Sequence, residues 1–128
     1  MQNTIHQAIL DGEDPSCIEG LLNQGIDKDA RNSVGSTPLM IAAMLDDVPI
    51  LKLLLDFGAD VESLNDSGWS ALHIAAKSNA LQTAAVLIAH GATTDVCDAR
   101  SRTPKYFASS PEMMELMSAA PLVGASEL

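Results

Sequence analysis

The sequence predicts an all-α protein in which short helix pairs stack into a solenoid. Three observations predict this fold: glycines recur at a 33-residue interval, short motifs recur with them, and each interval holds two helix-length apolar patterns between turn formers. Gly25, Gly58 and Gly91 mark the interval. One such unit cannot bury its own apolar stripe, whereas stacked units share a continuous core, and 128 residues hold about four units.

The first unit, residues 3–30, is an irregular copy. It retains the pair Leu21-Leu22 and Gly25, but Gly25 follows Ile5 by 20 residues, whereas Gly58 follows the matching Leu39 by 19. We expect that extra residue between Gly12 and Pro15.

The second unit, residues 31–63, shows how each helix begins and ends. Thr37 is a good N-cap, and Pro38 suits the first helical position because its missing N–H costs nothing there. Asp47 is expected to cap the second helix. An apolar stripe at i, i+3, i+4 and i+7 then runs through that helix to Gly58, which can end it in a left-handed conformation. The stripe consists of Ile50, Leu53, Leu54 and Phe57.

The third unit, residues 64–96, follows the same plan. The turn formers of residues 65–68 predict an extended hairpin between units. Asn79 has Gln82 three residues further on, which is close to a capping box, so we expect Asn79 to cap the second helix.

The fourth unit, residues 97–120, predicts a terminal cap. It retains Thr103-Pro104, but Lys105 stands at a normally apolar position, and a polar outward face is typical of a cap. Its second helix is expected to begin at Ser110-Pro111 and to end before Pro121. Residues 1–120 then form one domain, and residues 121–128 form a short flexible tail.

These residues resemble the ankyrin repeat, whose signature is G-x-T-P-L-H-x-A-A followed by L-L-x-x-G-A-D. Residues 35–43 read GSTPLMIAA, residues 54–60 read LLDFGAD, and residues 68–76 read GWSALHIAA. The resemblance covers roughly residues 3–117 and is specific in the two middle units. It implies paired helices joined by β-hairpin-like loops, and a binding role for the concave face and the hairpin tips.

Composition and charge exclude several classes of function. Seven basic and seventeen acidic residues give a net charge of −10, which disfavours nucleic acid and anionic membranes as partners. No apolar run approaches the roughly 18 residues that a transmembrane helix needs. Cys17 and Cys97 are too few for a disulfide framework, and the first residues show no signal pattern. We expect a cytoplasmic protein, or one in another compartment if a signal peptide was removed before the numbering begins.

The histidines and cysteines do not form a metal-ligating pattern, because the spacings typical of zinc sites are absent from the sequence. We expect a ring nitrogen of His73 to bond turn backbone, His90 to contact the last carbonyls of its helix, Cys17 to lie in the core and Cys97 to be partly exposed. No nucleophile-elbow or Gly-rich phosphate motif occurs. We therefore expect no metal, no cofactor and no catalytic residue, so the protein is not expected to be an enzyme.

The candidate partner-binding residues are those without a packing role in the repeat. Trp69, the only tryptophan, is the expected hot spot, with packing onto its own hairpin as the alternative. Met44 and Leu45 would extend an apolar patch, and Arg100 and Arg102 would form a basic end that meets carboxylates of a partner. The full set is Arg31, Val34, Ser36, Met44, Leu45, Asp66, Trp69, Lys77, Arg100 and Arg102.

Two functions follow from this interpretation. The first is a stand-alone inhibitor or regulator that binds one folded protein, for example an enzyme, and is a monomer when free. The resemblance to the short ankyrin-type inhibitors of cyclin-dependent kinases makes inhibition conceivable, although no residue points to a kinase. The alternative is a scaffold or spacer fragment of a larger multidomain protein. The degenerate, polar end units favour the first function.

Overall fold

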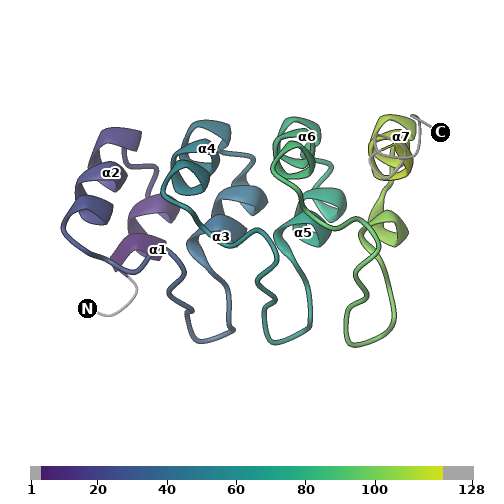
Figure 1. Ribbon diagram of the computed structural model, residues 1–128, viewed down its shortest axis with the longest axis horizontal. Coiled ribbons are helices and arrows are strands. Elements are labelled where there is room, and N and C mark those ends of the chain that lie inside the picture. The colour runs from purple at the N-terminus through teal and green to yellow at the C-terminus, as the bar shows by residue number, and fades with distance from the viewer. Residues whose placement is uncertain (1–3, 120–128) are drawn as a thin grey trace.

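The computed structural model describes residues 4–119, which form a row of helix pairs (Figure 1). The helices are α1 (Thr4–Leu10), α2 (Pro15–Asn23), α3 (Pro38–Leu45), α4 (Val48–Asp56), α5 (Ala71–Lys77), α6 (Leu81–Ala89), the 3-10 helix η1 (Pro104–Phe107) and α7 (Pro111–Ala119). Residues 4–119 contain no strand, and the loops between units project from the helices as hairpins. The predicted all-α solenoid is confirmed.

The helices lie in two layers that share one aliphatic core. The first helices of the units stand side by side in the order α1, α3, α5 and η1, and the second helices in the order α2, α4, α6 and α7 (Figure 1). Ala42, Ala43, Ala75 and Ala76 are fully buried in the first layer, where small side chains let neighbouring helices approach closely. The largest buried side chains include Ile18, Leu39, Leu51, Leu54, Leu72, Leu87 and Met113.

The predicted helix ends in the second unit are confirmed. The Thr37 side chain accepts a hydrogen bond from the Met40 amide at 3.3 Å, and Asp47 accepts one from the Ile50 amide at 3.4 Å. Gly58, with a φ of +88°, follows the end of α4. These contacts satisfy amides that a helix N-terminus leaves without a partner.

The buried stripe of α4 differs in part from its prediction. Ile50 and Leu54 are buried as expected, whereas Leu53 and Phe57 are only partly buried. Leu51 and Leu55 are buried beside Ile50 and Leu54, because α4 packs against the first layer and against both neighbouring second helices. The stripe is therefore wider than the four expected positions.

The prediction that Asn79 caps α6 is wrong. The N-cap of α6 is Ala80, which has no side chain able to accept a hydrogen bond, and Asn79 has a left-handed φ of 55°. The 33-residue interval explains this, because it pairs Asn79 with Asp46, which also has a φ of 55°, and pairs Ala80 with Asp47. The Asn79 carboxamide oxygen instead accepts a hydrogen bond from the Ser110 hydroxyl at 2.8 Å.

The prediction that Cys17 lies in the core is also wrong. Cys17 is exposed, while Ile18, the next residue of α2, is fully buried. Successive residues of a helix point about 100° apart, so Ile18 faces the core and Cys17 faces solvent. Cys97 is exposed, and the His90 ring lies 2.9 Å from the Val86 carbonyl near the end of α6, both in line with expectation.

The end units show the expected irregularities. α1 begins 34 residues before α3, whereas α2 begins 33 residues before α4, so the extra residue of the first unit lies between the starts of α1 and α2. In the fourth unit, a four-residue η1 replaces the first helix, and the Ser110 hydroxyl accepts the Met113 amide at 3.1 Å at the start of α7. Lys105 is exposed, as a polar cap requires. The expected helix stop at Pro121 and the tail of residues 121–128 lie outside the described residues.

One hydrogen-bonding pattern fixes each hairpin. One side-chain oxygen in each hairpin accepts hydrogen bonds from the backbone amides two and four residues further on, with N···O distances of 2.8–3.0 Å. The three residues that supply it are Asn32, Asn65 and Asp98. These three residues stand at the 33-residue interval. Short polar side chains that bond their own backbone in this way replace the hydrogen bonds that a strand would supply.

Adjacent hairpins lie in direct contact. The Asp66 amide donates to the Val34 carbonyl, and the Ala99 amide donates to the Ser67 carbonyl, both at 3.2 Å. Gly68 has a φ of +81°, and a Cβ atom there would lie 2.9 Å from the Ala99 amide nitrogen. Glycine is therefore required at this position by both conformation and space.

We expect Gly68→Ala to lower the free energy of unfolding by about 1–3 kcal/mol, since the new methyl group meets a left-handed φ and a neighbouring backbone.

Ser101, one interval further on, has a φ of 63° without a following hairpin among residues 4–119. Ser101→Gly is expected to raise stability by about 0.5–1 kcal/mol, because only conformational strain is relieved. Urea unfolding followed by circular dichroism measures the change in the free energy of unfolding for each variant. Changes of equal size and the same sign in the two variants would contradict this explanation.

Candidate functional site

A groove of about 400 Å³ lies on the layer of first helices, where α3 and α5 meet the hairpin between them. Met44 and Ile74 contribute to its apolar part, and Lys77 and Ser78 contribute to its polar part. The remaining lining residues are Ser36, Met40, Ile41, Asn65 and Trp69. We call this site the first-layer groove.

Four of the ten candidate residues meet in this groove, namely Ser36, Met44, Trp69 and Lys77. Leu45 is exposed at the end of α3 but does not line it. Val34 and Asp66 are exposed at two hairpin tips, and the exposed Arg31 donates a hydrogen bond to the Leu64 carbonyl. Arg100 and Arg102 lie on the last hairpin, outside the lining of the groove.

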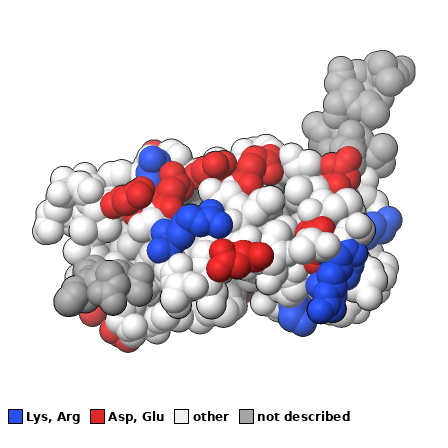
Figure 2. Space-filling model, turned by 90° about the horizontal axis from the view of Figure 1, so that it is seen from below, with Lys and Arg blue, Asp and Glu red and all other residues white. Residues whose placement is uncertain are grey.

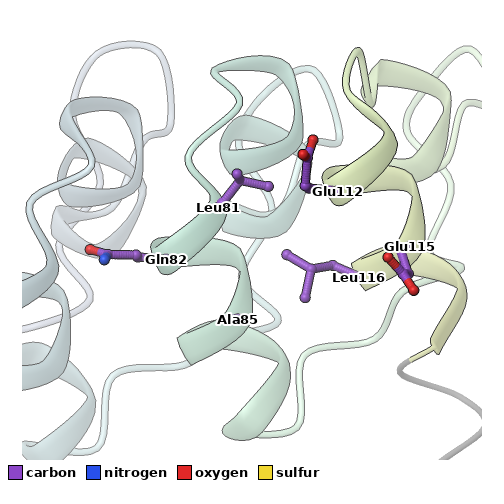
Figure 3. A pocket seen from close by; sticks show the side chains of 6 residues that line it. All are labelled: Leu81, Gln82, Ala85, Glu112, Glu115 and Leu116. Atoms are coloured by element: carbon purple, nitrogen blue, oxygen red, sulfur yellow. The ribbon is translucent and has the colours of Figure 1, made fainter.

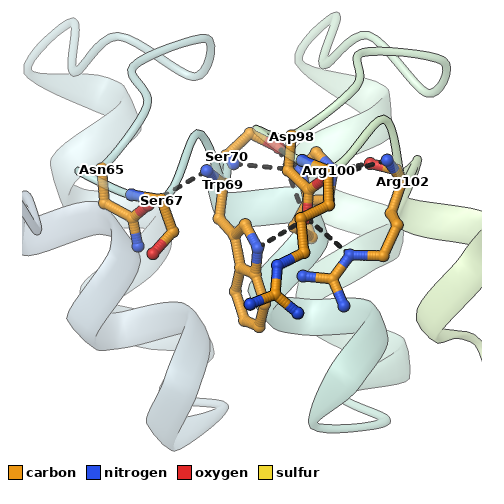
Figure 4. A network of polar contacts seen from close by, with 8 residues as sticks. Asn65, Ser67, Trp69, Ser70, Asp98, Arg100 and Arg102 are labelled. Carbon is orange, nitrogen blue, oxygen red and sulfur yellow. Dashed lines mark hydrogen bonds and ion pairs between the residues drawn. The ribbon is translucent and has the colours of Figure 1, made fainter.

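Trp69 combines a packing role with a place in the groove wall. Its indole N–H donates to the Asp98 carboxylate at 2.9 Å (Figure 4). Its ring lies 4.8 Å from the Phe107 ring and is stacked 6.3 Å from the His73 ring. Asp98 and Phe107 belong to the next unit, so Trp69 joins two units rather than folding onto its own hairpin. Its role as a binding hot spot stays a prediction.

Asp98 anchors the polar network around Trp69. Its side chain is 1% exposed and accepts hydrogen bonds from the amides of Arg100 and Arg102, from the Arg102 guanidinium at 3.0 Å and from the Trp69 indole (Figure 4). Burial alone would raise the pKa of Asp98. The hydrogen bonds, led by those from the Arg102 and Arg100 amides, outweigh burial and lower the pKa to about 2.

His73 ties the same hairpin to α5. Its Nδ1 accepts a hydrogen bond from the Ser70 amide at 3.1 Å, so the proton of the neutral ring lies on Nε2. Nε2 donates a hydrogen bond to the Arg102 carbonyl at 2.9 Å. Burial lowers the pKa of His73, although the bond to the Arg102 carbonyl and the charge of Asp98 oppose this effect. The expected bond between His73 and turn backbone is confirmed.

Cations and aromatic rings gather at the C-terminal end of the array. The Arg102 guanidinium lies 4.9 Å from the centre of the Phe107 ring and 5.6 Å from that of Tyr106, and Lys77 Nζ lies 6.0 Å from the Phe107 ring. Arg100 is exposed close by in sequence, on the same hairpin. We call Lys77, Arg100, Arg102 and Lys105 the basic cluster. It holds four of the seven basic residues of the chain.

Figure 2 shows one group of basic side chains at the C-terminal end of this face, others nearer its N-terminal end, and acidic side chains that follow one edge. Within residues 4–119, the ion pairs are Lys28–Asp29 and Arg102–Asp98. Lys77, Arg100 and Lys105 are exposed and form none with the described residues. Their charges are therefore open to a partner.

Several residues of this surface were not foreseen. Ile41 and Ile74 line the first-layer groove, and Tyr106 and Phe107 support the basic cluster. The structural role of Asp98 could have been predicted from the sequence, since Asp98 follows Asn32 and Asn65 at the 33-residue interval. The contacts of Phe107 with Trp69 had no comparable signal, because they depend on the side-chain geometry of adjacent units.

The described residues contain no group of three or more His, Cys, Asp or Glu side chains that could hold a metal ion. None of the helices within residues 4–119 is long and apolar enough to cross a membrane.

Comparison with known proteins identifies the repeat. The family described as ankyrin repeats (3 copies) matches residues 5–110, which is most of the chain. No curated protein matches the sequence.

The pKa of Asp98 predicts how stability depends on pH. A carboxyl pKa of about 2 lies below the usual value of about 3.9, so the stabilising effect of the ionised form is complete above pH ~4 and is lost as the pH falls toward 2. Asp98→Asn retains an oxygen for the two amides but removes the charge. We expect the variant to have a lower urea midpoint at pH 7, with a difference from wild type that shrinks below pH ~4. A difference that is constant with pH would contradict this role.

Proposed function

Because the chain belongs to the ankyrin-repeat family, we propose that it is a non-catalytic module that binds a folded protein partner through its concave face and hairpin tips. Ankyrin repeats are generally protein–protein interaction modules.

The observation that carries the proposal is the continuity between the first-layer groove and the basic cluster. Lys77 lines the groove and also lies 6.0 Å from the Phe107 ring, which Arg102 covers from 4.9 Å. A partner that crosses this surface meets the apolar groove first and the basic cluster next, in which Lys77, Arg100 and Lys105 form no ion pair with residues 4–119. We infer a partner segment with an apolar side chain for the groove and Asp or Glu side chains for the cations.

The wall of the groove is already ordered in the free chain. Trp69 is fixed by its bond to Asp98 and by the Phe107 ring, and the Asn65 oxygen fixes the hairpin that carries it. A rigid aromatic wall loses little conformational entropy when a partner binds. Met44, which is 46% exposed, is the adaptable part of the same groove.

We further propose that binding regulates an enzyme, since a rigid surface of this kind can cover the site of a folded protein as a stand-alone inhibitor does. The alternative is a scaffold or spacer within a larger multidomain protein. The overall charge of −10 supports protein rather than nucleic acid or an anionic membrane as the partner in either role. We propose that the free chain is a monomer.

Substitutions at exposed positions test the surface without disturbing the core. We expect Met44→Glu and Lys77→Glu each to weaken partner binding about tenfold or more, because the first places a carboxylate in an apolar groove and the second repels acidic side chains. Met114→Glu is the matched control, since Met114 on α7 is 47% exposed and lies outside the first-layer groove.

The measurement has two stages. Proteins captured from source-cell lysate by the wild-type chain are identified by mass spectrometry, and titration calorimetry then gives the affinity of the purified partner for each variant. If that partner is an enzyme, its activity at saturating chain concentration separates inhibition from scaffolding. Equal affinities for all four chains would contradict the proposed surface, whereas a selective loss with Met44→Glu and Lys77→Glu would support it.

A further inference from the structure

A second groove, of about 410 Å³, lies on the layer of second helices between α6 and α7 (Figure 3). Leu81 on α6 and Leu116 on α7 both point into the space between the two helices, and Ala85 lies one turn after Leu81 on α6. Glu112 and Glu115 contribute the α7 side, and the α6 side also includes Gln82. We call this site the second-layer groove. It belongs to the opposite layer of helices from the first-layer groove.

The sequence explains why the groove is open. Ala85 stands one 33-residue interval after Lys52, which is exposed on α4. A lysine at position 85 would lay its aliphatic stem along the apolar floor and bring a cation beside the glutamates. Alanine leaves the floor uncovered, with Leu81 and Leu116 only partly buried.

The charge around the groove has one sign. Glu112 and Glu115 are exposed and form no ion pair within residues 4–119, and neither α6 nor α7 contains a lysine or arginine. Glu112 lies in the first turn of α7, where a carboxylate also favours the helix dipole. Glu115 lies beyond that turn, so the helix dipole does not explain a carboxylate at this position.

We propose that the second-layer groove is a docking site for a segment of a partner protein in which an aliphatic side chain is flanked by Lys or Arg. The aliphatic side chain would cover Leu81, Ala85 and Leu116, and the cations would neutralise Glu112 and Glu115. This charge preference is opposite to that of the basic cluster. The chain would then join two partners of different chemistry, one on each layer.

The chain's own C-terminal residues offer the wrong charge for this groove. Residues 120–128 include Leu122 and Val123, but their only charged side chain is that of Glu127. The Glu127 carboxylate would be repelled by Glu112 and Glu115, whereas the cations of a basic segment would be attracted to them. Charge complementarity therefore favours an external basic segment.

Selection from a library of random 12-residue peptides tests the proposal on the full-length chain. Parallel selections use wild type, Ala85→Lys and the control Gln24→Lys, which adds the same charge at an exposed position on the other end of the array. Both substituted positions are exposed, and circular dichroism checks that each chain is folded.

We expect peptides that combine Leu, Ile, Val or Met with neighbouring Lys or Arg to be enriched by wild type and by Gln24→Lys, and to be at least tenfold depleted with Ala85→Lys. The best such peptide, made synthetically, should bind Glu112→Gln/Glu115→Gln several-fold more weakly than wild type at low salt. Acidic peptides that are still enriched by Ala85→Lys would be bound at the first-layer groove. The selection therefore distinguishes binding at the two sites.

Three results would overturn the proposal. The first is that no basic peptide is lost with Ala85→Lys, and the second is that the peptides lost are acidic or uncharged. The third is tighter binding of the best peptide when Leu122→Ser and Val123→Ser are introduced, because it would show that the chain's own C-terminal residues occupy the groove.

Discussion

The rest of the structure depends on one hydrogen-bonded arrangement, in which an Asn or Asp side chain accepts two amides of its own hairpin. It occurs at Asn32, Asn65 and Asp98 and lets each loop hold a fixed shape without a strand partner. Hairpins of fixed shape can then bond one another through backbone groups, and the first and last of the three also receive a histidine from the preceding unit. His6 bonds the Ser36 carbonyl and His73 bonds the Arg102 carbonyl, both at 2.9 Å. These histidines tie the first and last hairpins to the helices, and the backbone bonds between hairpins hold the middle one between them.

The last unit uses the same arrangement with a charged member, and this has consequences for function. Asp98 has a second oxygen that orients the Trp69 indole and the Arg102 guanidinium, so the end of the solenoid gains an aromatic cluster covered by cations. The fourth unit has only a short η1 in place of a first helix, and Phe107, the last residue of η1, packs against Trp69. A terminal unit that closes the core therefore also supplies the basic part of the proposed binding surface.

The sequence predicted those features that depend on local chemistry or on the 33-residue interval. Thr37 and Asp47 cap helices as expected because capping involves neighbours three residues apart. The errors at Asn79 and Cys17 are errors of register, since each residue lies one position away from one with the expected role. Four candidate residues do line one groove, but the contacts of Trp69 with Asp98 and Phe107 join residues 29 or more positions apart and depend on how units stack. The unit boundaries and the partner-binding roles stay predictions.

The central claim is that ordered hairpins present a preformed surface, and native-state hydrogen exchange by NMR tests it most directly. The amides of Ser67 and Trp69 donate to the Asn65 side chain at 2.9 and 3.0 Å on a hairpin without strands. The account predicts that both amides exchange far more slowly than in an unstructured peptide, and that Asn65→Ala removes this protection while the buried amides of α5 remain protected. Exchange of Ser67 and Trp69 at the rates of an unstructured peptide in the wild-type chain would contradict the account.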